Sequence, residues 1–270
     1  MMNSPGDHEN LQSLDLYNQG LGRVPKSVWQ HAELESLNLA DNALKAISEE
    51  IGNLASLTML DLGHNRLSSL PESLGKLTNL RFLYLSNNRL SSVPESLWVL
   101  RNLVYLNITD NQLASLPEEV GRLSNLIELR LYNNQLSSLP EAMGQLSNLR
   151  ELHAMGNQLT SLPDSIGTLK KLHKLMLEGN RMETLPESLG NLKSLTDLDL
   201  RNNRVKEVPK SIGKLKNLRF LDLRANQLTE LPASIARLQK LEKLDLRWNK
   251  SLASPKWLSK LEERGCIVYT

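Results

Sequence analysis

A leucine recurs every 23 residues along most of this chain, without one insertion or deletion. The recurring leucines stand at positions 11, 34, 57, 80, 103, 126, 149, 172, 195, 218 and 241. Self-similarity at a fixed period is the signature of a stacked repeat architecture. The repeat also explains why 60 of the 270 residues are leucine, since each repeat buries its leucines mainly against its neighbours. The chain is therefore predicted to be a solenoid rather than a single globule.

Each position of the unit has its own physical role. Counted from that leucine, the unit reads LxxLxLxxNxLxxLPxxIGxLxx. Leu at positions 4 and 6 alternates with polar residues, which predicts a strand with leucines inward and positions 3, 5 and 7 outward. The Asn at position 9 has both a donor and an acceptor, so we expect it to be buried and bonded to backbone. Pro at position 15 is expected at the first residue of a short helical segment.

This pattern resembles the leucine-rich repeat family. The 23-residue form, with Leu-Pro-x-x-Ile after the Asn, is similar to the repeats of Scribble-like scaffolds, plant Ras-group-related proteins and many bacterial repeat proteins. The resemblance covers residues 11–263. It implies an α/β fold, a right-handed horseshoe solenoid with one concave parallel β-sheet and short helical or 3-10 turns on the convex side. It also implies a scaffold that binds proteins on the concave sheet and is not an enzyme.

Three segments are expected. Residues 1–10 are polar and predicted to be a frayed N-terminal tail, and residues 11–254 form eleven repeats, of which the first and last are atypical. Residues 255–270 are predicted to be a C-terminal cap made of a short helix and a strand. Counting by 23 places Ile267 and Tyr269 at positions 4 and 6 of a rudimentary twelfth unit, which would turn them toward the core.

Composition argues against several classes of protein. The formal net charge of +2 gives no global case for a nucleic-acid or membrane-surface binder. No apolar run approaches the roughly 18 residues of a membrane-spanning helix. The start of the sequence has no apolar stretch typical of a secretory signal, and the one cysteine excludes a disulfide framework. We therefore expect a cytoplasmic monomer without membrane insertion, although export by a route without an N-terminal signal stays open.

Catalytic and metal-binding patterns are not found in the sequence. No histidine lies within the last 90 residues to activate Cys266, so this thiol is interpreted as a structural residue of the cap. His153 lies at an outward position beside Glu128 and Glu151, but no second His or Cys accompanies it, so no metal site is predicted. We expect no catalytic residue and no cofactor.

Positive charge increases toward the C-terminus. Residues 170–270 contain 21 basic and 12 acidic residues, a net charge of 21 − 12 = +9. Many of the lysines fall outside the strand positions, so this surface is interpreted as a solvated face that keeps the solenoid soluble. A secondary contact with anionic lipid or nucleic acid is the alternative. Aromatic residues do not interleave there, so nucleic acid is not expected.

Aromatic residues give the clearest functional signal. Seven of the 11 aromatics fall at the outward positions 3, 5, 7 and 8, which the leucine core does not need. Exposed aromatic and arginine side chains on a rigid sheet are typical anchors of protein interfaces. The predicted partner-binding site on the concave face consists of Met59, Phe82, Tyr84, Tyr105, Arg130 and Tyr132. The alternative is that these rings only stack on one another and stabilise the sheet.

A second candidate is a strip of charged residues in the last three units. It consists of Asp199, Arg201, Asp222, Arg224, Asp245, Arg247 and Trp248. Acidic and basic columns side by side are interpreted first as a self-neutralising surface ladder. The alternative is a polar recognition strip for a charged partner.

Two classes of function remain. The first is a non-catalytic protein-interaction scaffold that binds a protein partner on its concave face. A small GTPase of the Ras type is a partner that the family resemblance alone suggests. The second is the substrate-recognition domain of a larger enzyme or bacterial effector, for example a ubiquitin ligase, whose catalytic part is absent from this chain.

Overall fold

The computed structural model describes residues 11–270 and has one open, parallel sheet of twelve strands, hydrogen-bonded in sequence order. The strands are β1 (Ser13–Asp15), β2 (Ser36–Asn38), β3 (Met59–Asp61), β4 (Phe82–Tyr84), β5 (Tyr105–Asn107), β6 (Glu128–Arg130), β7 (Glu151–His153), β8 (Lys174–Met176), β9 (Asp197–Asp199), β10 (Phe220–Asp222), β11 (Lys243–Asp245) and β12 (Ile267–Tyr269). The predicted tail, residues 1–10, lies outside the described residues.

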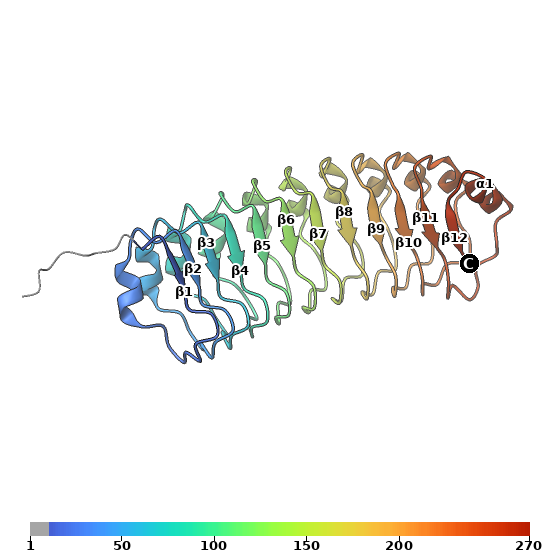
Figure 1. Ribbon diagram of the computed structural model, residues 1–270. Helices are drawn as coiled ribbons and strands as arrows, with labels where there is room; N and C mark the ends of the chain where they lie inside the picture. Colours follow the sequence, from blue (N-terminus) through green and yellow to red (C-terminus); the bar gives the residue numbers. More distant parts are fainter. Residues whose placement is uncertain (1–10) are drawn as a thin grey trace, which may run out of the picture.

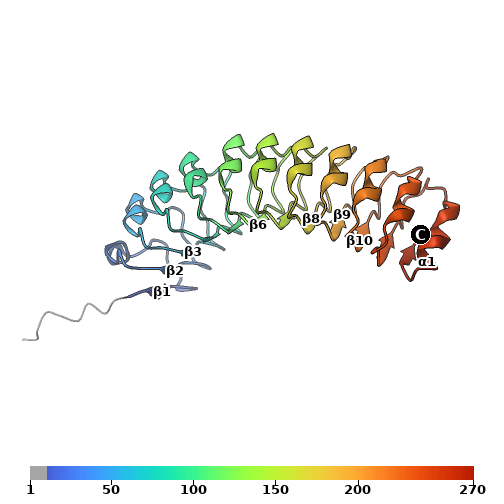
Figure 2. The same ribbon diagram turned by 90° about the horizontal axis from the view of Figure 1, so that it is seen from above.

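Short 3-10 helices follow the strands on the opposite face. They are η1 (Lys26–Gln30), η2 (Glu49–Asn53), η3 (Glu72–Lys76), η4 (Glu95–Val99), η5 (Glu118–Arg122), η6 (Glu141–Gln145), η7 (Asp164–Thr168), η8 (Glu187–Asn191), η9 (Lys210–Lys214), η10 (Ala233–Arg237) and η11 (Lys256–Leu258). One α-helical turn, α1 (Ser259–Glu262), follows η11. Figure 1 shows the strands side by side, and Figure 2 shows the sheet lining the inner side of an arc with the helices outside. This is the predicted solenoid with a concave parallel sheet.

The core lies between the sheet and the helices and runs the length of the solenoid. The register pairs Leu37 with Leu60 and Leu60 with Leu83, so one leucine column continues through successive strands. These leucines have no exposed surface. Each coil buries its leucines against its two neighbours, so the core does not need the side chains of the concave face.

Each buried Asn bonds to backbone, as predicted, and its bonds join its own coil to the preceding one. The side-chain amide of Asn111 donates to the carbonyl oxygens of Leu85 at 2.9 Å and Thr109 at 3.0 Å. Its carbonyl oxygen accepts the backbone N–H of Leu90 at 2.9 Å. The same pattern repeats from Asn65 to Asn249. The Asn column therefore closes the turn after each strand with bonds that water would otherwise have to supply.

The proline does not occupy the first helical position that the sequence suggested. Pro71 has φ −73° and ψ 149°, an extended conformation, and η3 begins one residue later at Glu72. Its fixed φ suits this extended approach to the helix. The first-turn donors are instead bonded by the preceding coil: the backbone N–H of Ser73 donates to a carboxylate oxygen of Glu49 at 3.0 Å.

Glycine at position 19 is required by contact between coils. A Cβ atom on Gly75 would lie 2.7 Å from the carbonyl oxygen of Ser96, in the next coil. Gly144 would meet the carbonyl oxygen of Ser165 at the same distance. Real Cβ atoms do not approach backbone so closely, so the glycines allow consecutive 3-10 helices to stack.

The cap differs from the sequence interpretation by one residue. Strand β12 pairs with β11 through Leu244 and Val268, so Val268 takes the inward position and Ile267 and Tyr269 face outward. Ile267 and Tyr269 are 55% and 40% exposed. The cause is local: the α-helical turn α1 and the turn at Gly265, with φ +86°, use one more residue than an ordinary 3-10 coil.

Candidate functional site

The concave face brings three of the predicted side chains into direct contact. The ring centroids of Tyr84 and Tyr105 lie 4.9 Å apart with an interplanar angle of 39°. The guanidinium of Arg130 lies 5.6 Å from the centre of the Tyr105 ring. The sheet register places Tyr105 directly between Phe82 and Glu128. These contacts form an aromatic and cationic patch across β4, β5 and β6.

The remaining predicted residues surround this cluster without sharing its stacking. Met59 and Phe82 are register neighbours at the start of β3 and β4. Tyr132 lies two residues beyond the end of β6. Within residues 11–270, Tyr84 and Tyr105 form the only stacked ring pair, so Tyr132 stands apart from it. All three of these surrounding residues are half-buried, and we call the six predicted residues together the concave aromatic patch.

Tyr84 and Tyr105, two of the three tyrosines of the patch, have phenols that stay protonated across the physiological range. Burial raises the pKa of Tyr84, and the nearby carboxylate of Asp61 raises it further. Burial also raises the pKa of Tyr105. A protonated phenol both donates and accepts a hydrogen bond. The stacked pair therefore offers ring surface together with two hydroxyl groups to a partner.

A charged rim borders the patch on β6 and β7. His153 Nε2 lies 3.0 Å from a carboxylate oxygen of Glu151 and 3.9 Å from one of Glu128. Arg130 pairs with Glu128 at 2.5 Å, and Lys174 pairs with Glu151 at 3.1 Å. Burial opposes ionisation of Glu151, but the hydrogen bonds from His153 and Lys174 outweigh it and lower its pKa.

These groups could hold a metal, but their geometry is already explained by ion pairing. Ligand atoms of Glu128, Glu151 and His153 lie within 4.8 Å of one another. Carboxylate and imidazole are suitable ligands for several divalent ions. Each carboxylate, however, already has a cationic partner, and a metal ion would have to displace it. The rim is therefore described as an ion-pair network.

The charged strip in the last three units forms a ladder of ion pairs. Arg224 pairs with Asp222 and Arg247 pairs with Asp245, both at 2.6 Å. Arg224 also reaches Asp245 at 3.4 Å, which joins the two coils. Asp245 has no exposed surface, so its carboxylate interacts with Arg224 and Arg247 rather than with an external partner. The geometry fits the self-neutralising ladder.

One carboxylate of the strip has an unusual protonation equilibrium. Burial raises the pKa of Asp199 to about 6, although the backbone N–H and the guanidinium of Arg201 favour the ionised form. Asp199 is 8% exposed. Its Oδ1 accepts the N–H of Arg201 at 3.1 Å, and its Oδ2 lies 3.3 Å from the Arg201 guanidinium. The desolvation of the charged form is therefore the dominant influence.

Trp248 is part of the strip but not of the ladder. It is 65% exposed and has φ +64°, a left-handed conformation that is rare for a bulky residue. Arg247 lies 5.6 Å from the Trp248 ring centre and 4.8 Å from that of Tyr269. The sequence interpretation missed Tyr269 as a concave residue because it assumed an uninterrupted 23-residue step. The segment between Pro255 and β12 is one residue longer than in the other coils, and this extra residue is what turns Tyr269 to the concave face.

The Cys266 side chain is buried, and burial raises the pKa of its thiol, so the reactive thiolate is disfavoured. Within residues 11–270, every helix is too short or too polar to cross a lipid bilayer.

Comparison with known protein families gives one consistent answer. A leucine-rich repeat region matches residues 72–155, 92–178 and 188–263. A second leucine-rich repeat family matches residues 9–67, 32–90 and 155–205. The chain belongs to the leucine-rich repeat family. No curated protein matched this chain.

Solved structures of leucine-rich repeat proteins agree with this assignment. A protein of Leptospira interrogans is 28% identical with a TM-score of 0.50, and the match covers 96% of both chains. The ectodomain of the Arabidopsis thaliana receptor kinase GASSHO1/SCHENGEN3, in complex with CASPARIAN STRIP INTEGRITY FACTOR 2, is 33% identical with a TM-score of 0.73 over 83% of this chain. The plant peptide hormone receptor RGFR1, in complex with RGF2, is 31% identical with a TM-score of 0.74 over 96%. This chain spans 31% and 47% of those two receptor chains.

Proposed function

We propose that this leucine-rich repeat protein is a non-catalytic scaffold that binds a protein or peptide partner at the concave aromatic patch. The observation that carries the proposal is the cluster of Tyr84, Tyr105 and Arg130 on the concave sheet. Aromatic rings and arginine dominate the binding energy of protein interfaces, and a charged rim around them is the usual arrangement. The two receptors described above were solved in complex with CASPARIAN STRIP INTEGRITY FACTOR 2 and with RGF2, which supports a binding role for this architecture.

The rigidity of the solenoid favours binding at this patch. The concave side chains project from a sheet whose every strand is hydrogen-bonded to its neighbours. A partner that docks there therefore orders few new groups, and less conformational entropy is lost on association. A small GTPase is one partner that the family suggests, and the fold does not favour it over other proteins. A cytoplasmic location belongs to the same proposal, because the single cysteine fits a reducing compartment.

A recognition domain within a larger protein is the second candidate function. The receptor kinase ectodomain that this chain resembles is itself a recognition part of an enzyme, and the chain spans only 31% of its length. The same concave patch would then select the substrate, so the same residues would be tested.

The test is affinity capture from the native cell lysate, followed by measurement of affinity for each captured protein. The double variant Tyr84→Ala, Tyr105→Ala should lose at least about 2 kcal/mol, roughly 30-fold in Kd. Tyr17→Ala is the matched control, because Tyr17 is 52% exposed at the N-terminal end of the same face. Unchanged affinity in the double variant would place the binding site elsewhere. Unfolding of the double variant would show that the patch is structural.

A further inference from the structure

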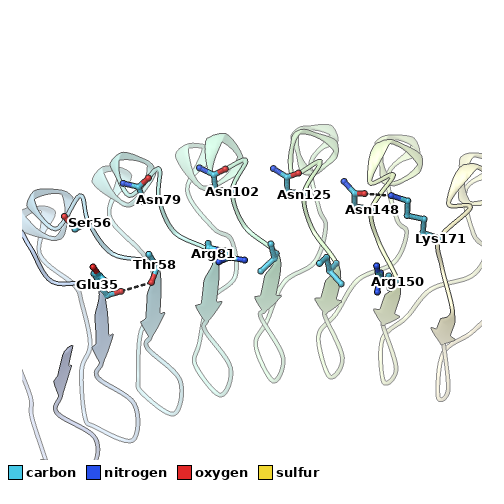
Figure 3. A pocket seen from close by; sticks show the side chains of 12 residues that line it. Glu35, Ser56, Thr58, Asn79, Arg81, Asn102, Asn125, Asn148, Arg150 and Lys171 are labelled. Atoms are coloured by element: carbon cyan, nitrogen blue, oxygen red, sulfur yellow. Dashed lines mark hydrogen bonds between the residues drawn. The ribbon is translucent and has the colours of Figure 1, made fainter. Parts of the chain in front are cut away.

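A groove runs along the edge of the sheet where the chain enters the strands. It has a volume of about 760 Å³ and crosses six coils, from Glu35 to Lys171. Two columns of side chains line it, one at the last position of each unit and one at the second position of the next (Figure 3). The groove borders the concave aromatic patch but is formed by different residues.

The upper wall is a ladder of asparagines at the last position of consecutive units. The side-chain amides of Asn79, Asn102 and Asn125 each donate to a backbone carbonyl of the preceding coil, at 2.8 to 3.0 Å. Within residues 11–270 their carbonyl oxygens accept no hydrogen bond. Figure 3 shows these oxygens directed along the groove toward the following coil. At the end of the ladder, Lys171 Nζ donates to Asn148 Oδ1 at 2.7 Å. The wall therefore presents fixed acceptors to an external N–H donor.

The floor of the groove consists of two apolar residues with an arginine on either side. Arg81, Val104, Ile127 and Arg150 occupy the second position of four consecutive units. Ile127 is 39% exposed, and Val104 is half-buried beside it. Both arginines are exposed, and neither has a carboxylate partner among residues 11–270. Exposed apolar surface between two unpaired cations is suited to a ligand that is apolar in its middle and acidic on both sides.

Another coil shows what a neutralised arginine looks like at the same repeat position. Arg219 stacks over the Phe220 ring at 5.2 Å, as Arg81 stacks over Phe82 at 5.7 Å. Arg219, however, makes two bonds to Glu242, at 2.7 and 3.0 Å. The positive charge at Arg81 is thus uncompensated in a position where this chain elsewhere supplies its own carboxylate.

We propose that this groove binds an extended segment of an acidic polypeptide, with an acidic residue at i, an apolar residue at i+2 and an acidic residue at i+4. Arg81 and Arg150 are three coils apart, which corresponds to about 14 Å at the usual spacing of strands. In an extended chain, side chains at i and i+4 lie on one face and about 13 Å apart. The acidic residues therefore reach both arginines, and the residue between them lies on Val104 and Ile127.

The charges at the two ends of the groove determine how far an acidic peptide can extend beyond the two arginines. Lys171 adds a positive charge beside Arg150, at the end of the asparagine ladder. Glu35 adds a negative charge at the opposite end, beyond Arg81. A longer acidic segment is therefore favoured past Arg150 and disfavoured past Thr58. Guanidinium groups also hold carboxylates by paired hydrogen bonds, which adds specificity beyond simple charge attraction.

The probe for the test is a fluorescein-labelled nonapeptide with glutamate at its third and seventh residues, leucine at its fifth and glycine or serine elsewhere. Binding is followed by fluorescence anisotropy at low salt. The double variant Arg81→Ala, Arg150→Ala should weaken binding at least about tenfold, while Arg219→Ala should leave it unchanged. A reference peptide with the two glutamates adjacent should bind the wild-type protein at least about tenfold more weakly.

A charge exchange separates the groove from an effect on folding. The variant Arg81→Glu, Arg150→Glu should lose the acidic peptide and bind one with lysine in place of both glutamates. The variant Tyr84→Ala, Tyr105→Ala should bind the acidic probe normally, so failure of the concave site would leave this result intact. No binding by the wild-type protein, equal binding of the two acidic peptides, or no effect of the arginine substitutions would each overturn the proposal. Equal binding of the peptides with spaced and with adjacent glutamates would show that the groove attracts negative charge without recognising its spacing.

Discussion

The side-chain oxygen of Asn111 accepts the backbone N–H of Leu90, 21 residues earlier in the chain, at 2.9 Å. The amide nitrogen of the same side chain donates to Leu85, Ile108 and Thr109. One buried amide therefore joins the turn of its own strand to the preceding coil. Removing it leaves several backbone groups without a partner, which is more expensive than the loss of one exposed hydrogen bond.

Asn111→Ala should consequently lower the free energy of unfolding by at least about 2 kcal/mol, because several buried groups lose their partners. Gln112→Ala is the matched control, since Gln112 is exposed and adjacent. Asn133 is unsuitable as a control although it is exposed, because its φ of 54° would strain an alanine. Thermal melting followed by circular dichroism measures the difference. Equal melting temperatures of the two variants would contradict the structural role of the Asn column.

The residue three positions beyond the end of each strand suggests a stabilising substitution. Among residues 11–270, nine non-glycine residues have positive φ, and all nine occupy position 8 of the repeat. Most of them are Asn, Asp or His, which tolerate this conformation, but Ala225 has φ 50°. Ala225→Asn should raise the free energy of unfolding by about 0.5–1 kcal/mol, because the left-handed conformation is less unfavourable for Asn. Denaturant unfolding would detect this, and a lower stability of the variant would count against the assigned backbone strain.

The repeated part of the fold follows from the sequence, and the departures from the repeat do not. Leucine periodicity predicts the strands, the buried core and the Asn column because these depend on contacts that recur in every coil. The contact of Gly75 with Ser96 could not be found by examining one unit, since it forms between neighbouring coils. The concave position of Tyr269 was missed because a single extra residue reverses which face of a strand a side chain occupies.

The placement of the concave aromatic patch was accessible from sequence, because positions 3, 5 and 7 of the repeat map onto one face of the sheet. The groove at the edge of the sheet was not accessible from sequence, because its charge depends on which arginines form an ion pair with a carboxylate. Arg81 and Arg219 occupy the same repeat position, and only the presence of Glu242 in the next coil distinguishes them.

Asp199 should make stability depend on pH near neutrality. Its pKa is about 6 in the folded protein, above the ordinary value of 3.8, so the folded state binds the proton more tightly. The stability from this proton is fully present below pH 3.8 and is lost as the pH rises through about 6. Asp199→Asn stays neutral at every pH, and its side-chain oxygen can still accept the N–H of Arg201.

The Asn variant should therefore be more stable than the wild-type protein at pH 8, by about 1–3 kcal/mol, because one pKa unit corresponds to about 1.4 kcal/mol. The two proteins should approach equal stability near pH 4. Urea unfolding between pH 4 and pH 8 measures both curves, and Asp164→Asn is a control at an exposed aspartate. Parallel curves for wild type and the Asp199 variant would show that this carboxylate does not titrate in that range.

The register of the last strand can be tested by two substitutions one residue apart. Val268 pairs with the fully buried Leu244 and faces the end of the core, whereas Ile267 is 55% exposed beside Lys243. A carboxylate at residue 268 would be placed against the leucines of the last repeat, where an unpaired charge is strongly unfavourable. Val268→Asp should lower the free energy of unfolding by about 2–4 kcal/mol and fray the solenoid from this end. Ile267→Asp should change it by less than about 0.5 kcal/mol, because that side chain lies in solvent.

A strict 23-residue step predicts the opposite order, with Ile267 inward. Thermal melting of the two variants, with size-exclusion chromatography to detect aggregation, therefore decides which residue closes the core.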